Sequence, residues 1–344
     1  MGRPRVRLRD IAEATGFSAN TVSLALRSSP RIPKETRELI LKEAERQNYL
    51  PNHIARSLVS RATRTIGLVL TDITNPTLTL AARSVEQRLS SEGYRVMFAA
   101  SYGQLENEQR AISVFRSYQV DGMLVYPASH QELSHLQALQ DAGQPIVLLV
   151  PGVGSGMESV GIDDRAGART AVAHLLGLGH RRIAMLDGGV RTGNREKHEG
   201  YMKAHEEAGV APDPALFVDP MGSRPSDSYR CIGPLMGIAE PPTAVFASND
   251  TLAIGVLGWC RENGVRVPDD LAVVGYDNVE VAAFADVPLT TINYAVDTVV
   301  EIAVRRLLAL IAGETTEGDP ETGLIAPELI VRQSCGARAA AKSE

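Results

Sequence analysis

The chain has 344 residues, more than one small domain usually contains, and typical domain sizes of about 100 to 200 residues predict two or three folded units. Hydrophobic residues make up 44% of the sequence and charged residues 22%, which is typical of globular proteins and excludes a largely disordered chain. No stretch approaches the ~18 consecutive apolar residues of a transmembrane helix, and no apolar signal-peptide region follows the basic N-terminus. We therefore expect a cytoplasmic protein with no membrane partner.

Charge is distributed unevenly along the chain. Residues 1–64 contain 13 Lys and Arg against 6 Asp and Glu, whereas the remaining residues contain 22 against 35, so the net charge of −6 combines a basic start with an acidic remainder. A basic segment of this kind is where a polyanion such as DNA would bind. On charge alone, the alternative is a solvated basic tail with no binding role.

A first short helix is expected near the N-terminus. Leu8, Ile11 and Ala12 recur at helical spacing, and the pattern stops at Thr15. Gly16 follows, and glycine tolerates the positive φ that a tight turn requires. The chain is therefore predicted to turn at Gly16.

A second helix is expected to begin after Ser18, because serine is favoured at the N-cap position. Its apolar stripe for packing consists of Val22, Ala25 and Leu26. The residues left outside this stripe are Asn20, Thr21, Ser23, Leu24 and Arg27. Two short helices joined by a turn, the second exposing small and polar residues at its start, form the helix-turn-helix arrangement that places a recognition helix in the major groove of DNA.

A third helix is expected with Pro33 at its first position and with Leu39, Ile40 and Ala44 on its inner face. The three helices would share one small core. The alternative is a helical cap on a larger domain, which would not explain the uneven charge or an outer face poor in carboxylates.

After residue 64 the pattern changes to short apolar runs that alternate with amphipathic helices. The expected strands are residues 65–70, 95–99, 122–126, 145–150, 182–186, 244–247 and 271–275. The expected helices between them include residues 106–118, 166–178, 196–208 and 251–263. This alternation predicts α/β architecture with parallel sheets, and its length favours two similar subdomains with a cleft between them. Ligands of open α/β sheets bind at the carboxyl ends of the strands.

Three segments of the first 60 residues resemble the DNA-binding headpiece of the lactose/galactose repressor (LacI/GalR) family, without a gap in order or spacing. They are LRDIAEATGFSANTVSLAL at residues 8–26, IPKETR at residues 32–37 and NYLPNHIARSL at residues 48–58. The resemblance implies a hinge at residues 51–60 that becomes helical on operator binding, with Arg56 beside the DNA backbone and Leu58 as an apolar wedge in the minor groove. A linker leucine packed on the core is the alternative for Leu58. The DNA-binding positions that the resemblance implies are Ser18, Ala19, Asn20, Thr21, Ser23, Leu24, Asn52, Arg56 and Leu58.

The resemblance continues over nearly the whole chain, through GLVL at residues 67–70, GHRRI at residues 179–183, GYDN at residues 275–278 and PLTTI at residues 288–292. It implies a three-helix headpiece joined to a periplasmic-binding-protein-like sensor domain of two doubly wound parallel-sheet subdomains. The implied boundaries are a headpiece at 1–50, a hinge and linker at 51–64, a core at 65–336 and a tail at 337–344. Within the core, the first subdomain would take about 65–162 and 293–325, and the second about 163–290 and 326–336.

Family effector contacts are implied at Thr77, Leu78, Tyr102, Arg191, Lys197, Ser223, Asn249 and Asp277. Carboxylate, amide and cationic side chains of this kind suit a polyhydroxylated ligand, a sugar or sugar derivative. For each residue taken alone, an ordinary polar position is the alternative. Four positions depart from the family. Thr77 and Leu78 stand in a loop that usually carries aromatic rings, Ser223 stands where some members have one, and Lys197 replaces the more usual arginine. These departures leave the identity of the sugar open.

The expected partners are double-stranded operator DNA, a small-molecule effector and a second copy of the chain. A homodimer is favoured over a tetramer, because the alanine-rich tail from Cys335 lacks apolar heptads. A sugar-binding protein of the transport type with no DNA role and a sugar-modifying enzyme are the competing hypotheses.

Enzyme, metal and cofactor motifs are incomplete. His198-Glu199 begins like HExxH, but Met202 stands in place of the second histidine, and the glycines at residues 152–156 fit no phosphate loop. Asp163-Asp164 suits an N-cap and a polar contact better than an acid/base pair. The three cysteines, Cys231, Cys260 and Cys335, are widely spaced, which favours free thiols over disulfides or zinc. We expect no catalysis, no cofactor and no metal.

Overall fold

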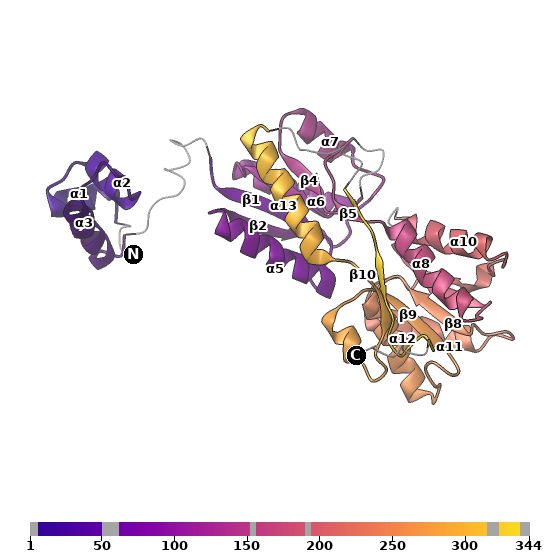
Figure 1. Ribbon diagram of the computed structural model, residues 1–344. Coiled ribbons are helices and arrows are strands. Elements are labelled where there is room, and N and C mark those ends of the chain that lie inside the picture. The colour runs from indigo at the N-terminus through magenta and orange to yellow at the C-terminus, as the bar shows by residue number, and fades with distance from the viewer. Residues whose placement is uncertain (1–5, 50–61, 152–155, 190–193, 315–322, 338–344) are drawn as a thin grey trace, which may run out of the picture. The chain divides into compact units, whose positions relative to one another are not determined.

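The computed structural model describes residues 6–49, 62–151, 156–189, 194–314 and 323–337 (Figure 1). The chain forms two compact units, Met1–Thr63 and Arg64–Glu344. None of the described helices combines the length and the apolar character that crossing a bilayer requires.

The first unit consists of the helices α1 (Leu8–Thr15), α2 (Ala19–Leu26) and α3 (Lys34–Arg46). The local predictions for its turns are confirmed: Gly16 ends α1 with φ +72°, and the Ser18 hydroxyl caps α2 by accepting from the Thr21 amide at 3.1 Å. Pro33 is the N-cap of α3 and not its first helical residue, because its ψ of 146° is extended. The core of this unit consists of Ile11, Ala12, Val22, Ala25, Ile32, Ile40 and Ala44.

One prediction for α3 is wrong. Leu39 is 52% exposed and does not belong to the inner face, whereas Ile40 and Ala44 are buried. Consecutive helical residues differ by about 100° in direction, so a run of apolar residues cannot all face one core. Arg37 lies on the inner side of α3 and donates to the carbonyls of Ser29 and Ile32, which ties the helix to the preceding loop.

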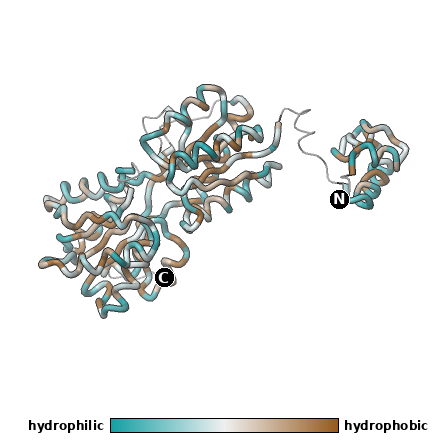
Figure 2. Tube along the Cα trace, turned by 180° about the vertical axis from the view of Figure 1, so that it is seen from behind, coloured by the Kyte–Doolittle hydropathy of each residue, from teal (hydrophilic) through white to brown (hydrophobic). Residues whose placement is uncertain are grey.

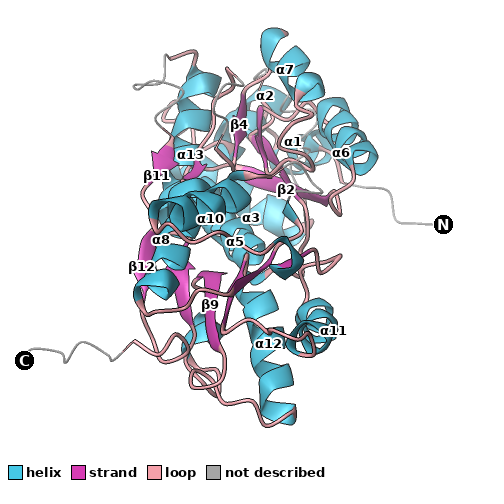
Figure 3. Cartoon of the chain, turned by 90° about the vertical axis from the view of Figure 1, so that its right-hand side faces the viewer, coloured by secondary structure: helices cyan, strands magenta, loops and turns pink. Residues whose placement is uncertain are grey.

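The described part of the second unit contains two large sheets and a two-stranded one, and each large sheet with its helices is here termed a lobe (Figure 3). The first lobe is built on a parallel sheet of order β2-β1-β3-β4. Its strands are β1 (Thr65–Leu70), β2 (Arg95–Ala100), β3 (Gly122–Val125) and β4 (Ile146–Leu148), and its helices are α5 (Pro76–Ser91), α6 (Leu105–Ser117), α7 (Ser134–Asp141) and α13 (Val296–Ala312). Helices α5 and α13 pack together on one face, and α6 and α7 cover the other.

The second lobe has a sheet of order β12-β10-β9-β8-β6-β7, in which only the pairing of β10 with β12 is antiparallel. Its strands are β6 (Ile183–Leu186), β7 (Phe217–Val218), β8 (Ala244–Ala247), β9 (Ala272–Asp277), β10 (Thr290–Asn293) and β12 (Glu328–Ile330). Its helices are α8 (Asp164–Gly177), α10 (Glu196–Glu207), α11 (Pro225–Met236), α12 (Asp250–Glu262) and the 3-10 turns η1 (Pro214–Leu216) and η2 (Glu280–Ala283). Helices α8 and α10 cover one face, and α11 and α12 the other. Figure 2 shows hydrophobic residues along the strands of both lobes, which is where the cores lie.

The predicted α/β architecture with two parallel-sheet subdomains is confirmed, and each of the seven expected strands is present. The expectation did not include β5 (Gly161–Ile162), β7, β10, β11 (Leu324–Ile325) and β12. Most of these strands are only two or three residues long, too short to show a period of two.

The chain passes between the lobes three times: after β4, after β10 and between α13 and β12. At the first and third crossings β5 pairs with β11 in parallel. The backbones approach so closely here that a Cβ on Gly161 would lie 2.4 Å from Pro151 Cδ, and one on Gly323 would lie 2.0 Å from the Ser159 carbonyl oxygen. Glycine is therefore required at both positions.

Candidate functional site

Helix α2 presents small and polar side chains to solvent at its start. Ala19 and Asn20 are exposed, and Val22 and Ala25 are buried on the opposite side. The helix contains no acidic residue, which favours approach to phosphate. Its first turn is stabilised by the Ser18 hydroxyl, which caps the helix and contacts the Thr21 hydroxyl at 2.9 Å.

The remaining α2 positions are partly engaged within the unit. The Arg27 guanidinium donates to the Ser23 hydroxyl and to the Ser23 carbonyl. Leu24 is partly buried against the three-helix core, so only part of its side chain is free for contact with a base. The other implied DNA-binding positions, Asn52, Arg56 and Leu58, lie outside the described residues.

Polar side chains of both lobes meet where strands end, and we name this group the interlobe site: Thr77, Tyr126, His130, Asp164, Asp187, Glu196, Lys197, Asn249 and Asp277. Tyr126 follows β3, Asp187 follows β6, and Asp277 ends β9. The charges of Asp164 and Glu196, from the second lobe, act on both Tyr126 and His130 of the first lobe.

Asp277 is a strongly perturbed carboxyl of the interlobe site. Burial raises its pKa from 3.8 to about 7, against the attraction of Lys197, and the nearby Asp250 carboxylate adds to the rise. Its backbone has φ +113°, in a region that side chains rarely adopt, so the turn after β9 holds the carboxyl in a defined place.

Lys197, the second residue of α10, holds its ammonium inside the second lobe. Nζ donates to the Ser248 carbonyl at 2.8 Å, lies 3.9 Å from Asp164 Oδ1 and sits 3.7 Å from the centre of the Tyr276 ring. A carbonyl oxygen, a carboxylate and the face of an aromatic ring therefore stabilise the ammonium.

The other implied effector residues are placed differently. Thr77 is buried and its hydroxyl acts on the Asp277 carboxyl, whose pKa it lowers, whereas Leu78 belongs to the first lobe's core. Both line a small apolar pocket with Tyr126 and Tyr294. Tyr102 is 65% exposed, at φ +54° after β2.

Two second-lobe positions serve the start of α12. Asn249 caps this helix through its Oδ1, which accepts from the Leu252 amide at 2.8 Å, and the Ser223 carbonyl accepts from Thr251 at 2.5 Å. The amide nitrogen of Asn249 can donate to further acceptors. Arg191 lies outside the described residues.

The sequence reasoning missed Tyr126, His130, Asp187 and Glu196 as members of the site. Burial lowers the pKa of His130 and raises that of Tyr126, so both side chains are held neutral near pH 7. Tyr126 ends one predicted strand and Asp187 directly follows another, which was the available signal.

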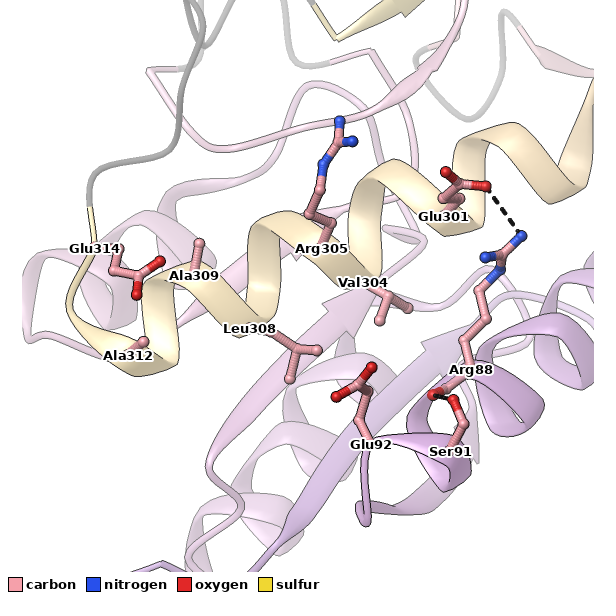
Figure 4. A pocket seen from close by; sticks show the side chains of 10 residues that line it. All are labelled: Arg88, Ser91, Glu92, Glu301, Val304, Arg305, Leu308, Ala309, Ala312 and Glu314. Atoms are coloured by element: carbon pink, nitrogen blue, oxygen red, sulfur yellow. Dashed lines mark hydrogen bonds and ion pairs between the residues drawn. The ribbon is translucent and has the colours of Figure 1, made fainter.

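A separate surface groove lies between α5 and α13 of the first lobe, with an ion pair of 3.3 Å between Arg88 and Glu301 across it (Figure 4). Its apolar floor is short and includes Val304 and Leu308. The groove shares no residue with the interlobe site.

The incomplete HExxH segment has structural roles. The His198 ring lies 4.8 Å from the Phe217 ring, and Glu199 pairs with Arg165 on the surface. Asp163 caps α8 by accepting from the Ala166 amide at 2.9 Å, as predicted. No group of His, Cys, Asp or Glu in the described parts of the chain has the geometry of a metal site.

Comparison with known proteins assigns both units. Residues 7–52 match the model of bacterial regulatory proteins of the lacI family, and residues 172–335 match the periplasmic binding protein-like domain. The chain is 33% identical over 342 residues to the HTH-type transcriptional regulator DegA of Bacillus subtilis (strain 168), covering 96% of this chain and 98% of that protein. The chain belongs to the LacI family.

Solved LacI-family structures agree with this assignment over the same length. A lac repressor dimer bound to operator and the anti-inducer ONPF superposes with a TM-score of 0.85 at 25% identity, covering 96% of this chain and 99% of that one. A complex of the transcriptional regulator CelR with cellobiose gives a TM-score of 0.69 at 29% identity, covering 96% and 100%.

The chain is thus a DNA-binding transcription regulator of the LacI family. The alternative of a transport-type sugar-binding protein is wrong, because the regulatory match begins at residue 7 and includes the helix-turn-helix.

Proposed function

We propose that the chain represses transcription from a pseudo-palindromic operator, and that a sugar or sugar derivative bound in the interlobe site sets its affinity for that operator. The observation that carries the proposal is the pairing of an exposed, carboxylate-free α2 with a buried polar site between two lobes. The relatives support both halves: one is described as bound to operator, the other as a complex with cellobiose.

Base reading is assigned to α2. Ser18, Ala19, Asn20, Thr21, Ser23 and Leu24 are the proposed contacts in the major groove. Residues 1–50 would act as the headpiece and residues 51–64 as the hinge, in which Asn52, Arg56 and Leu58 would contact the minor groove and backbone. The same family likeness motivates these hinge roles.

Effector binding is assigned to residues from both lobes. The proposed contacts are Thr77, Leu78, Tyr102, Arg191, Lys197, Ser223, Asn249 and Asp277, to which we add Tyr126, His130 and Glu196. A ligand that touches both lobes changes operator affinity only by its difference in affinity for their two relative positions.

A homodimer is proposed as the DNA-binding form, since two headpieces match the two halves of a pseudo-palindrome. Exposed apolar side chains support a protein interface on each lobe. Val281 of η2 is 55% exposed and Phe284, which follows η2, is 82% exposed, and Leu80 and Phe98 are exposed on the first lobe. Isolated exposed apolar residues are common, but neighbouring large ones favour contact with another subunit.

The proposal includes no catalysis, since the relatives are regulators, and it places the protein in the cytoplasm, where its DNA is. Genomic footprinting would identify the operator, and fluorescence anisotropy would then measure operator affinity with and without candidate sugars. We expect binding to a two-fold site and a change of about 5- to 150-fold with the effector. Binding that no sugar or sugar derivative alters would contradict the proposal, as would a monomer on the operator in sedimentation.

A further inference from the structure

We propose that Asp250 is a positioning residue that holds one turn of the second lobe, and that this turn links the interlobe site to subunit association. The turn follows β9 and carries the Asp277 carboxyl at one end and the exposed apolar side chains of η2 at the other. The inference rests on the proposed function, because it names how the effector site and the subunit contact regulate one another.

Asp250 is a fully buried carboxylate at the start of α12, directly after the helix cap Asn249. Its oxygens accept hydrogen bonds from two other segments of the lobe. Oδ2 accepts from the Val279 amide at 2.9 Å, and Oδ1 accepts from the Thr291 hydroxyl on β10 at 2.6 Å. Because a buried carboxylate is costly without such donors, the position of Asp250 and the position of the turn depend on each other.

The turn after β9 has a backbone conformation that needs to be held. Asp277 has φ +113° and Asn278 has φ +58°, and neither residue is glycine. Such conformations persist only where the surrounding structure fixes them. Asp250 fixes the turn at the Val279 amide, and Arg332 fixes it by donating to Asn278 Oδ1 at 2.7 Å.

Asp250 also lies directly against β9, the strand that Asp277 ends. A Cβ on Gly275 would lie 2.2 Å from Asp250 Oδ1, so the carboxylate has no room to shift toward the strand. Its negative charge acts on the Asp277 carboxyl and raises the pKa of that group. Asp250 therefore influences both the place and the charge of a proposed effector contact.

The same turn leads into η2. Val279, whose amide binds Asp250, is the N-cap of η2, and the Ala282 carbonyl accepts from the Leu289 amide at 2.8 Å. Val281 and Phe284, which we assign to subunit contact, are exposed in this short segment. A ligand that displaces Asp277 would thus change the free energy of subunit association, and association would change ligand affinity by the same factor.

The test uses Asp250→Asn, which keeps the shape of the side chain, removes its charge and turns one acceptor into a donor. Full-length protein is compared with the parent without DNA or ligand. Sedimentation equilibrium gives the dimer dissociation constant, and carbon-13 NMR of labelled aspartate follows the Asp277 carboxyl, assigned as the signal missing from Asp277→Asn. We expect the dimer to weaken by about tenfold, because the Val279 and Thr291 donors lose part of their acceptor.

The Asp277 carboxyl should titrate at a lower pH in Asp250→Asn than in the parent, where its pKa is about 7. The pKa of Asp250 is about 6, so Asp250 is ionised in the parent when Asp277 titrates, and the variant lacks this repulsion.

Two control variants should leave both measurements unchanged. Asp270→Asn changes a carboxyl near the other end of β9, which pairs with Arg266 on the surface. Ile232→Val removes a methyl group from the buried core of the same lobe and lowers stability without touching the turn. If Asp250→Asn does not fold, Thr291→Val decides, because it removes one hydrogen bond to Asp250 and should also weaken the dimer.

An Asp250→Asn protein that dimerises as tightly as the parent, or in which Asp277 titrates as in the parent, would overturn the inference. Equal weakening of the dimer in Ile232→Val would do the same, since it would reduce the effect to a loss of stability. A parent protein that stays monomeric on its operator would instead contradict the proposed homodimer, and the Asp277 titration would then decide the positioning role.

Discussion

The ammonium of Lys197 lies 3.7 Å from the centre of the Tyr276 ring, so one side of the cation is covered by a buried aromatic face on β9. The residue after this tyrosine is Asp277, whose carboxyl pKa Lys197 holds down against the effect of burial. One lysine therefore orders the end of β9 and sets the charge of the neighbouring carboxyl.

Replacing this lysine should raise the pKa of Asp277. In Lys197→Met the carboxyl keeps its burial and loses the attraction of the ammonium, so its pKa should rise above about 7. Carbon-13 NMR titration of the aspartate carboxyls measures it. Lys203→Met is the matched control, because Lys203 pairs with Glu206 on the outer side of the same helix. An unchanged Asp277 titration would show that Lys197 does not affect the pKa of Asp277.

Asp277 should make stability depend on pH. Its folded pKa, about 7, exceeds the unfolded value near 3.8, so the folded state binds the extra proton between these values. The free energy of unfolding therefore falls as pH rises through this window and levels off above pH 7. Between pH 5 and pH 7 the loss from this group should be about 2 kcal/mol.

Urea unfolding at several pH values checks this dependence. Asp277→Asn should remove most of the slope that this group contributes, and Asp286→Asn should retain it, because Asp286 is exposed and pairs with Arg261. Asp250, whose pKa burial raises to about 6, contributes in the same direction and remains in both variants. Equal slopes in Asp277→Asn and the parent protein would exclude Asp277 as the source.

Asn20 should read one base pair. Its exposed amide can form two hydrogen bonds with an adenine edge, while Ala19 offers only apolar contact, for example to a thymine methyl group. Asn20→Ala should cost about 1 to 3 kcal/mol of operator affinity at one position per half-site. Anisotropy titrations against single-base operator variants measure it. Equal weakening on every sequence would place Asn20 on the phosphate backbone.

The inner face of α3 can be tested with two adjacent residues. Ile40→Ala should lower the stability of the first unit by about 2 to 4 kcal/mol, because Ile40 is fully buried. Leu39→Ala removes a side chain that is largely exposed, and should change stability by less than about 1 kcal/mol. Thermal unfolding followed by circular dichroism of the headpiece signal compares them. A larger loss of stability for Leu39→Ala than for Ile40→Ala would support the prediction from sequence that Leu39 lies on the inner face of α3.

Local features of the fold could be predicted because neighbouring residues determine them. The turn at Gly16 and the cap at Ser18 depend on one residue's φ preference and one hydroxyl. Leu39 was misplaced because it adjoins Ile40 and Leu41, and periodicity alone does not choose among three consecutive apolar residues.

The interlobe site is harder to predict, since His130 and Glu196 come from different lobes and are brought together only by the chain crossings. The pKa of Asp277 responds to groups of both lobes, Thr77 of the first and Lys197 of the second, and no sequence pattern records this.

Helix α13 has a consequence for synthesis of the protein. Val299, Val300 and Ala303 of this helix fill the core of the first lobe, yet the helix follows the last parallel strand of the second lobe in the sequence. At about 5 to 20 residues per second, a ribosome needs on the order of ten seconds or more to extend the chain from β4 to the end of α13. During that interval the apolar face formed by Ile66, Leu68 and Leu124 is covered by α5 alone and lacks α13. The first lobe, although it is translated first, therefore keeps apolar surface exposed to chaperones and to aggregation for longest.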